Sequence, residues 1–121
     1  MIEYQFKKLN VWHLGMELVN EIYKLTKDFP KEEQFSLTSQ LKRAIISVPL
    51  NISEGATRRS RKEFAQFLRI ALGSLVEVMT CLEIALNQKY ITEGERNKID
   101  PLLEKLYFQI IALEKSLKIK P

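Results

Sequence analysis

Seven apolar residues between positions 64 and 85 recur at alternating intervals of four and three. They are Phe64, Leu68, Ala71, Leu75, Val78, Leu82 and Ala85. This 3.5-residue repeat is typical of helices that pack nearly parallel at a shallow crossing angle. Ser60 and Glu63 stand in capping-box spacing directly before the repeat, which places the start of the helix at about Arg61. The repeat therefore predicts a long bundle helix over residues 61–88.

A second series of the same kind lies near the end of the chain. Its members are Ile99, Leu103, Leu106, Ile110, Leu113 and Leu117. Thr92 and Glu95 form another capping-box pair before it, so we expect a helix over residues 93–118. Pro101 falls early in this helix. Either the helix bends there, or Asp100 caps a new helix that begins at Pro101.

The amino-terminal third carries an apolar stripe that is broader than one core requires. Its central positions are Val11, Leu14, Leu18, Ile22, Leu25 and Phe29, and Trp12, Met16, Val19 and Tyr23 widen it. The spacing predicts an amphipathic helix over residues 9–29. Pro30 should end this helix, because proline disfavours the helical conformation of the residue before it and cannot donate a backbone hydrogen bond.

A further helix is expected over residues 37–55, with Ser36 as its N-cap. Its apolar positions are Leu37, Leu41, Ala44, Val48 and Ile52. Pro49 should kink or bulge this helix rather than end it, because the stripe resumes at Ile52. Gly55 is expected to stop the helix in a left-handed conformation.

Four helices joined by short loops favour an all-α, antiparallel up-down four-helix bundle. The chain has 121 residues, of which 45% are hydrophobic, which suffices for one core and a single domain spanning residues 1–121. Nothing in the first ten residues resembles a secretory signal, and no apolar run is long enough to span a membrane. With its single cysteine, the chain is therefore expected in the cytoplasm.

Positive charge is concentrated in one segment. Residues 42–69 contain seven basic and two acidic residues, a net charge of +5, whereas the remainder of the chain carries −1. Four of the basic residues surround the expected start of the third helix: Arg58, Arg59, Arg61 and Lys62. A helix amino terminus adds partial positive charge and free N–H groups that favour phosphate. The segment is either a solvated turn or a site for salt-sensitive contacts with the backbone of RNA or DNA.

The sequence is poor in groups that could catalyse a reaction. It has one histidine, one cysteine and two aspartates, and it lacks zinc-ligand, phosphate-loop and nucleophile motifs. His13 falls on the polar face of the first helix, and Cys81 flanks the core stripe of the third. A pairing of Glu54 with Glu77 for hydrolysis is a remote alternative. We therefore predict a protein that is not an enzyme, with no cofactor, metal or small-molecule substrate.

Polar residues follow the edges of two apolar stripes. Gln40, Arg43, Ser47, Asn51 and Glu54 share a row of the second helix, and Ser74 and Glu77 share a flanking row of the third. The two rows should face each other in a helical hairpin. They predict a partly buried network in which Arg43 and Glu77 support each other, or else a polar patch that faces a partner. Gly73 and Ser74 should let a neighbouring helix approach closely.

The run from Gln40 to Gly55, with its sequence QLKRAIISVPLNISEG, resembles the four-helix-bundle family encoded in intervening sequences of bacterial 23S rRNA genes. Val11-Trp12, Phe29-Pro30, residues 64–68 and residues 71–77 extend the resemblance over nearly the whole chain. It implies a bacterial, cytoplasmic, ring-like homopentamer associated with the ribosome or RNA. A related group that looks similar, the accessory variability determinants of diversity-generating retroelements, binds nucleic acid through a basic surface.

The resemblance also carries over five residues as structural or assembly residues: Arg43, Asn51, Glu54, Gly55 and Glu77. Two functional hypotheses follow from the residues and the resemblance together. The first is a non-enzymatic oligomeric adaptor that binds RNA or DNA through the basic turn. The second is a protein–protein scaffold that does not bind nucleic acid.

Overall fold

Four α-helices contain most of residues 5–118, the part of the chain that the computed structural model describes. They are α1 (Asn10–Thr26), α2 (Leu37–Ala56), α3 (Arg61–Asn87) and α4 (Glu93–Ser116). Two short 3-10 helices, η1 (Gln5–Lys8) and η2 (Lys31–Glu33), precede α1 and α2. Residues 5–118 contain no β-strand. The predicted all-α fold class is confirmed.

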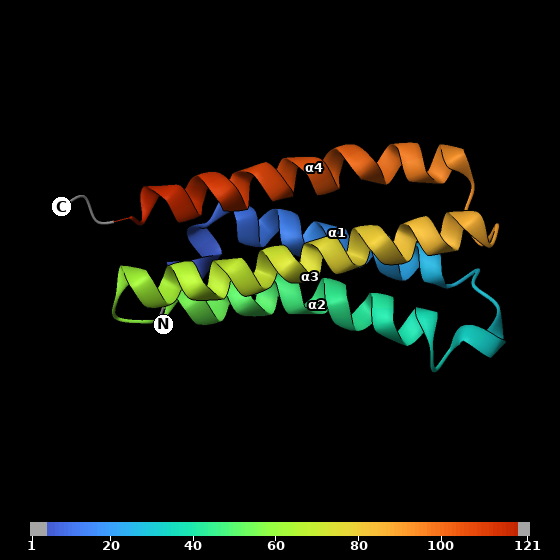
Figure 1. The fold of residues 1–121 in the computed structure, drawn as a ribbon, viewed down its shortest axis with the longest axis horizontal. Helices are drawn as coiled ribbons and strands as arrows, with labels where there is room; N and C mark the ends of the chain where they lie inside the picture. Colours follow the sequence, from blue (N-terminus) through green and yellow to red (C-terminus); the bar gives the residue numbers. More distant parts are fainter. Residues whose placement is uncertain (1–4, 119–121) are drawn as a thin grey trace.

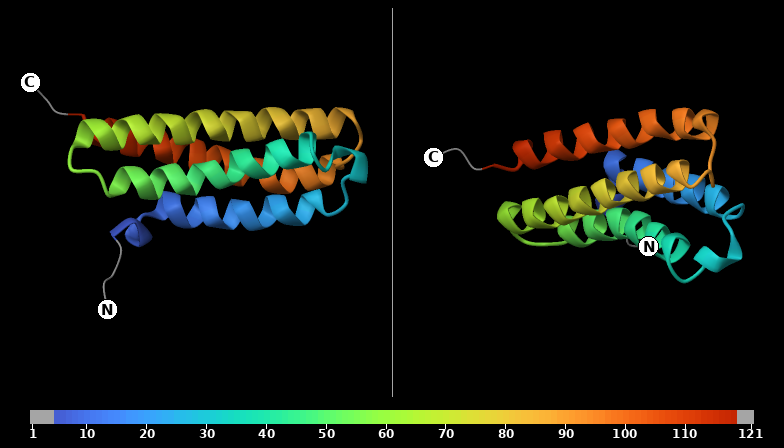
Figure 2. Two further views of the ribbon diagram at one scale, coloured as in Figure 1. Left: turned by 90° about the horizontal axis from the view of Figure 1, so that it is seen from below. Right: turned by 45° about the vertical axis from the view of Figure 1, so that its right-hand side comes forward.

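The helices run alternately up and down (Figure 1). Each packs against two others, so that α1 contacts α2 and α4, and α3 contacts the same two helices. The turn between α2 and α3 lies at one end of the bundle, beside the carboxyl end of α4 (Figure 2). This arrangement is the predicted antiparallel four-helix bundle.

The core is formed by the predicted stripes. Six of the seven members of the α3 repeat are buried, and Phe64 is half-buried. Fully enclosed side chains come from all four helices: Leu18, Ile22, Leu41, Ile45, Ile52, Leu68, Leu75, Leu82, Leu103, Leu106 and Ile110. Burial of such a side chain stabilises the fold by about 1.5–3 kcal/mol before the loss of conformational entropy is counted.

Helix α1 is shorter than predicted, because it ends at Thr26 rather than Phe29. The backbone N–H groups of Asp28 and Phe29 donate to the carbonyls of Leu25 and Thr26, three residues earlier, and so form tight turns instead of helix. Phe29 is buried, and its ring lies 5.6 Å from that of Tyr90. Tyr90 belongs to the loop between α3 and α4, so the end of α1 at Thr26 allows Phe29 to pack against this loop.

Helix α2 begins where predicted, but a different residue caps it. Ser36 is at the N-cap position and makes no capping hydrogen bond with its side chain. Instead, the carboxylate of Glu33 accepts a hydrogen bond from the N–H of Leu37 at 3.3 Å and one from the hydroxyl of Ser36 at 2.6 Å. Ser36 is therefore the predicted N-cap residue by position, and the side-chain hydrogen bond to the first turn comes from Glu33 of η2.

Both internal prolines lie within uninterrupted helices. Helix α2 continues through Pro49, which is buried against α1. A Cβ atom built on Gly15 of α1 would lie 3.5 Å from that of Pro49, at ordinary van der Waals distance, so Pro49 packs beside Gly15 where α1 and α2 meet. Helix α4 runs through Pro101 from the predicted capping box of Thr92 and Glu95. The alternative in which Asp100 caps a new helix is therefore wrong.

Candidate nucleic-acid interface

The four predicted basic residues lie together at the end of the bundle where α2 turns into α3. Arg58 and Arg59 belong to the turn, and Arg61 and Lys62 are the first two residues of α3. The hydroxyl of Ser60 accepts a hydrogen bond from the N–H of Glu63 at 3.1 Å and so caps α3 as predicted. All four basic side chains are exposed.

Gly55 sets the tightness of this turn, although not in the predicted way. It has no positive φ, and α2 continues past it to Ala56. A Cβ atom at Gly55 would lie 2.7 Å from Cβ of Phe67 and 2.9 Å from Cδ1 of Phe64, too close for ordinary contact. Gly55 is therefore required for the close approach of α2 to α3, and the expected left-handed helix stop is wrong.

Arg58 differs from the other three basic residues because its charge is already engaged. Its guanidinium donates to Oε1 of Glu54 at 2.8 Å and stands over the ring of Phe67, 4.8 Å from the centroid. Glu54 thus pairs within its own helix end and does not meet Glu77. The sequence pattern did not predict the cation–π contact between Arg58 and the ring of Phe67.

Arg59, Arg61 and Lys62 form no ion pair with any residue in the described range 5–118. They stand at the amino end of α3, where the helix dipole and free N–H groups add to the positive potential. Arg69, two turns further along α3, donates from Nε to Oε1 of Glu114 on α4 at 2.8 Å. Among the four predicted residues, three therefore remain free to meet an anion.

The polar rows of α2 and α3 face each other as predicted. The hydroxyls of Ser47 and Ser74 are 2.9 Å apart, and the amide of Asn51 donates to both the hydroxyl and the carbonyl of Ser47. Nearer the other end, the amide of Gln40 approaches Glu77 at 3.5 Å. Asn51 thus bonds Ser47 of its own helix beside this seam, and its carried-over structural role stays a prediction.

Gly73 does not contribute to this seam. It is exposed, and a Cβ atom built on it would meet no atom within 4 Å. The predicted close approach of a neighbouring helix at Gly73 is therefore wrong for the single chain, while Ser74 does meet its neighbour.

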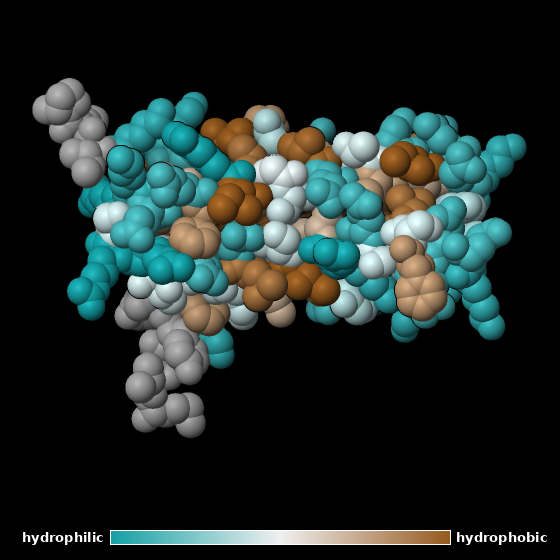
Figure 3. Space-filling model, turned by 60° about the horizontal axis from the view of Figure 1, so that its bottom comes forward, coloured by the Kyte–Doolittle hydropathy of each residue, from teal (hydrophilic) through white to brown (hydrophobic). Residues whose placement is uncertain are grey.

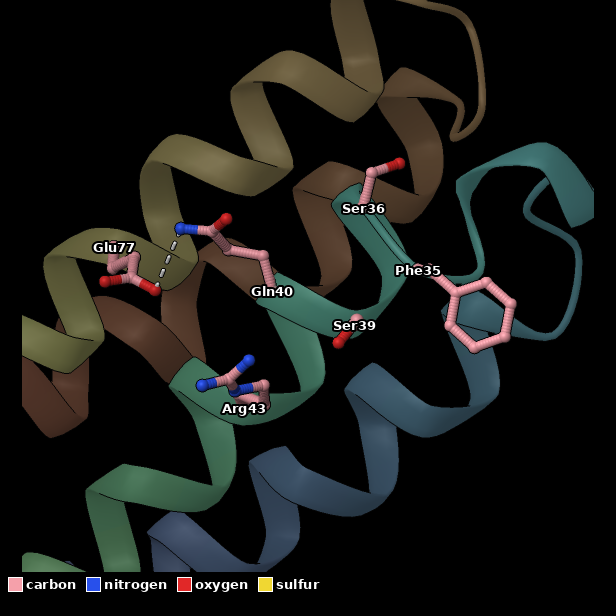
Figure 4. A pocket seen from close by; sticks show the side chains of 6 residues that line it. All are labelled: Phe35, Ser36, Ser39, Gln40, Arg43 and Glu77. Carbon is pink, nitrogen blue, oxygen red and sulfur yellow. Dashed lines mark hydrogen bonds between the residues drawn. The ribbon is translucent and has the colours of Figure 1, made fainter.

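Arg43 of α2 and Glu77 of α3 both line a cavity of about 290 Å³ at the surface (Figure 4). Phe35, Ser36, Ser39 and Gln40 complete its lining. Both charged side chains are exposed, and no ion pair joins them. The prediction that they support each other near the bundle interior was wrong, because both side chains are exposed and Glu77 accepts its hydrogen bond from Gln40 instead. Their carried-over role in assembly stays a prediction.

Other reactive groups are not gathered into a site. Burial of the Cys81 thiol, helped by the charge of Glu77, raises its pKa, so the reactive thiolate is disfavoured at neutral pH. No three His, Cys, Asp or Glu side chains within residues 5–118 are placed to hold a metal ion. Within the same range, no helix is long and apolar enough to cross a membrane.

The fold and its surface define a small up-down four-helix-bundle protein with a basic end. More particularly, the chain belongs to the 23S rRNA-intervening sequence protein family, whose model matches residues 7–112. It is also similar to the crystal structure of a protein of unknown function from the S23 ribosomal protein family of Bacteroides thetaiotaomicron. The two share 27% sequence identity with a TM-score of 0.80, over 87% of this chain and 95% of the other.

No curated protein is similar enough to match the chain. Neither the family nor the similar structure indicates an enzyme, and the structure's own description leaves its function unknown. The likeness to the accessory variability determinants stays a prediction, as does the cytoplasmic location.

Proposed function

We propose that this protein is a non-enzymatic, self-associating adaptor that binds RNA or DNA through the turn between α2 and α3. The observation that carries the proposal is the cluster of Arg59, Arg61 and Lys62, exposed and without acidic partners among residues 5–118, at the amino end of α3. A family named for sequences within 23S rRNA genes gives this surface a nucleic-acid context.

Binding should follow the phosphate backbone rather than the base sequence. The two aromatic rings that pack at this turn, Phe64 and Phe67, are half-buried, and Arg58 stands over Phe67, so neither offers a fully exposed face for a stacked base. Flexible cations at a helix amino terminus contact phosphates and release counterions, which makes the affinity strongly dependent on salt.

The test is a titration of mixed-sequence single-stranded RNA and duplex DNA at several salt concentrations. Each phosphate that the protein neutralises should add about 0.7 to the log-log salt slope for a single strand and about 0.9 for a duplex. The variant R59A/R61A/K62A should flatten the slope without changing sequence preference. A matched control, K27A/K98A/K105A, removes the same charge from exposed lysines that follow α1 or belong to α4 and form no ion pair within residues 5–118.

An equal loss of nucleic-acid affinity in the two triple variants would show that only net charge matters. The basic turn would then be rejected as the binding site. Negligible binding by the wild type at low salt would reject the nucleic-acid proposal altogether. The scaffold hypothesis would then remain, and one observation favours it: Phe35 is 89% exposed beside the cavity that Arg43 and Glu77 line (Figure 4).

Self-association is supported by an apolar strip along α1 and α2. It consists of Trp12, Met16, Val19 and Tyr23 on α1 and Ile46 and Leu50 on α2. Lys42 of α2 lies 4.8 Å from the ring centroid of Tyr23, so the α1 row does border α2. Apolar side chains gather over the middle of the face that α1, α2 and α3 share (Figure 3). Monomers seldom expose large contiguous apolar patches, and a second copy would cover this one.

A closed homo-oligomer, a pentamer as the resemblance implies, should give a mass about five times the 14.2 kDa of the chain by light scattering. Leu50, which is 60% exposed on the strip, can be compared with Phe108, which is 64% exposed on α4. L50E should dissociate the oligomer, whereas F108E should not. A stable wild-type monomer at micromolar concentration would contradict the proposal.

A further inference from the structure

A cavity of about 410 Å³ lies between the first turns of α3 and the carboxyl end of α4. Because the two helices are antiparallel, these segments meet at the same end of the bundle as the basic turn (Figures 1 and 2). Four basic residues line the cavity: Arg61, Lys62, Arg69 and Lys118. Ala65 and Leu117 give it an apolar part.

The convergence of these cations has a simple geometric origin. Lys62 and Arg69 are seven residues apart on α3, which puts them on one face of the helix. That face borders α4, as the hydrogen bond from Arg69 to Glu114 shows. Lys118 lines the cavity from the α4 side, because it directly follows Leu117, the C-cap residue of α4. Only the antiparallel fold brings Lys118 to the start of α3.

The cavity keeps an excess of positive charge after its internal pairing. Glu114, whose side chain is 16% exposed, neutralises one of the four cations, which leaves a net charge of about +3 at the cavity. The pairing uses Nε of Arg69, so its two terminal nitrogens stay available for another acceptor. Basic residues are favoured at helix carboxyl termini because they interact with the helix dipole. This explains the presence of Lys118, but it does not explain the three basic residues from α3.

We propose that this cavity binds the phosphate groups of a nucleic-acid strand, so that the strand crosses from the basic turn onto the groove between α3 and α4. The inference rests on the proposed function and extends it by two residues, Arg69 and Lys118. The volume lies within the range of ligand-binding pockets and exceeds what one phosphate needs, so a phosphate with part of its nucleotide fits.

The experiment measures binding of a mixed-sequence single-stranded RNA to the full chain at several salt concentrations. The variant R69A/K118A leaves Arg59, Arg61 and Lys62 of the basic turn in place. It should weaken binding at low salt about tenfold and reduce the salt slope by about 0.7 for each phosphate that the variant no longer neutralises. The control K98A/K105A removes the same charge from exposed lysines of α4 outside the cavity and should bind like the wild type.

A second variant separates binding from folding. E114Q removes the negative charge that neutralises Arg69, so it should strengthen RNA binding several-fold even if it slightly lowers stability. A purely structural role for the Arg69–Glu114 pair predicts weaker or unchanged binding instead. Circular dichroism should confirm that each variant is folded.

The outcomes distinguish this inference from the proposed function. If the wild type binds RNA and R69A/K118A matches K98A/K105A, the cavity is not a phosphate site, while the basic turn stands. If no RNA binds, a titration with inorganic tripolyphosphate decides whether the cavity takes free phosphate. If tripolyphosphate binds and R69A/K118A abolishes that binding, the cavity is a site for phosphate groups but not for a nucleic-acid strand. If neither RNA nor tripolyphosphate binds, the inference is overturned.

Discussion

The hydroxyl oxygens of Ser47 on α2 and Ser74 on α3 lie 2.9 Å apart, and this hydrogen bond joins the two helices across a partly buried seam. Asn51 donates a further hydrogen bond to Ser47, so the seam contains a chain of three polar side chains. Such a network stabilises the packing and also fixes the register of the two helices, because a shift along either helix would leave these groups unpaired.

S74A should lower the free energy of unfolding by about 0.5–1.5 kcal/mol, because the hydroxyl of Ser47 loses one partner. In a double-mutant cycle with S47A, the coupling energy should be at least about 0.5 kcal/mol. T80A is the control, since the Thr80 hydroxyl is exposed and bonds only the Val76 carbonyl of its own helix. Strictly additive effects of S47A and S74A in urea unfolding would contradict the coupling.

Two glycines should respond to alanine in opposite directions. G55A should destabilise the protein by about 1–3 kcal/mol, because its methyl group would overlap Phe67 and Phe64. G73A should stabilise it by about 0.5–1 kcal/mol, because Gly73 lies inside α3 facing open space. The measurement is chemical denaturation of both variants, and a neutral G55A would show that the turn can widen without cost.

The carboxylate of Glu33 should make stability depend on pH. Hydrogen bonds from Ser36, Tyr90 and the N–H of Leu37 lower its pKa from the ordinary 4.5. The folded state thus binds fewer protons than the unfolded state, and the contribution is complete above pH 4.5 and is lost as pH falls through the folded pKa. E33Q should lose this part of the acid dependence.

Thermal unfolding between about pH 3 and pH 7, a range that includes the ordinary value of 4.5, tests this prediction. The wild type and E33Q should differ most near neutral pH and converge toward the acid end. D28N is the control, because Asp28 is exposed and makes no side-chain hydrogen bond to another described residue. Parallel curves for wild type and E33Q would contradict the role of Glu33.

R43A and E77A should each change stability by less than about 0.5 kcal/mol, because both residues are exposed and unpaired with each other. R96A provides the contrast. Arg96 is 17% exposed and bonds Glu83 at 2.7 Å and Asp100 at 2.8 Å, which ties α4 to α3. Its loss should cost about 1 kcal/mol, and an R43A variant as unstable as R96A would show that Arg43 has a buried role.

Much of the fold could be read from local spacing. The repeat of four and three from Leu68 to Ala85, together with the caps at Ser60 and Thr92, predicted the extent of α3 and the start of α4. These signals are local, because a helix places residues three and four apart on one face whatever surrounds it. The basic turn was predicted for the same reason, since its four residues are nearly consecutive.

Contacts between distant segments depended on the tertiary structure. Spacing identified Arg43 and Glu77 as flanking residues, but the packing of the helices decided that both are exposed and that Glu77 bonds Gln40 rather than Arg43. The requirement for glycine at position 55 depends on where Phe67 packs. Arg69 pairs with Glu114, which lies 45 residues later in the chain. By itself the sequence determined the helices, their core faces and the basic turn. Only packing decided which cations pair between helices and that Lys118 completes a basic cavity, because that depends on which helix faces meet.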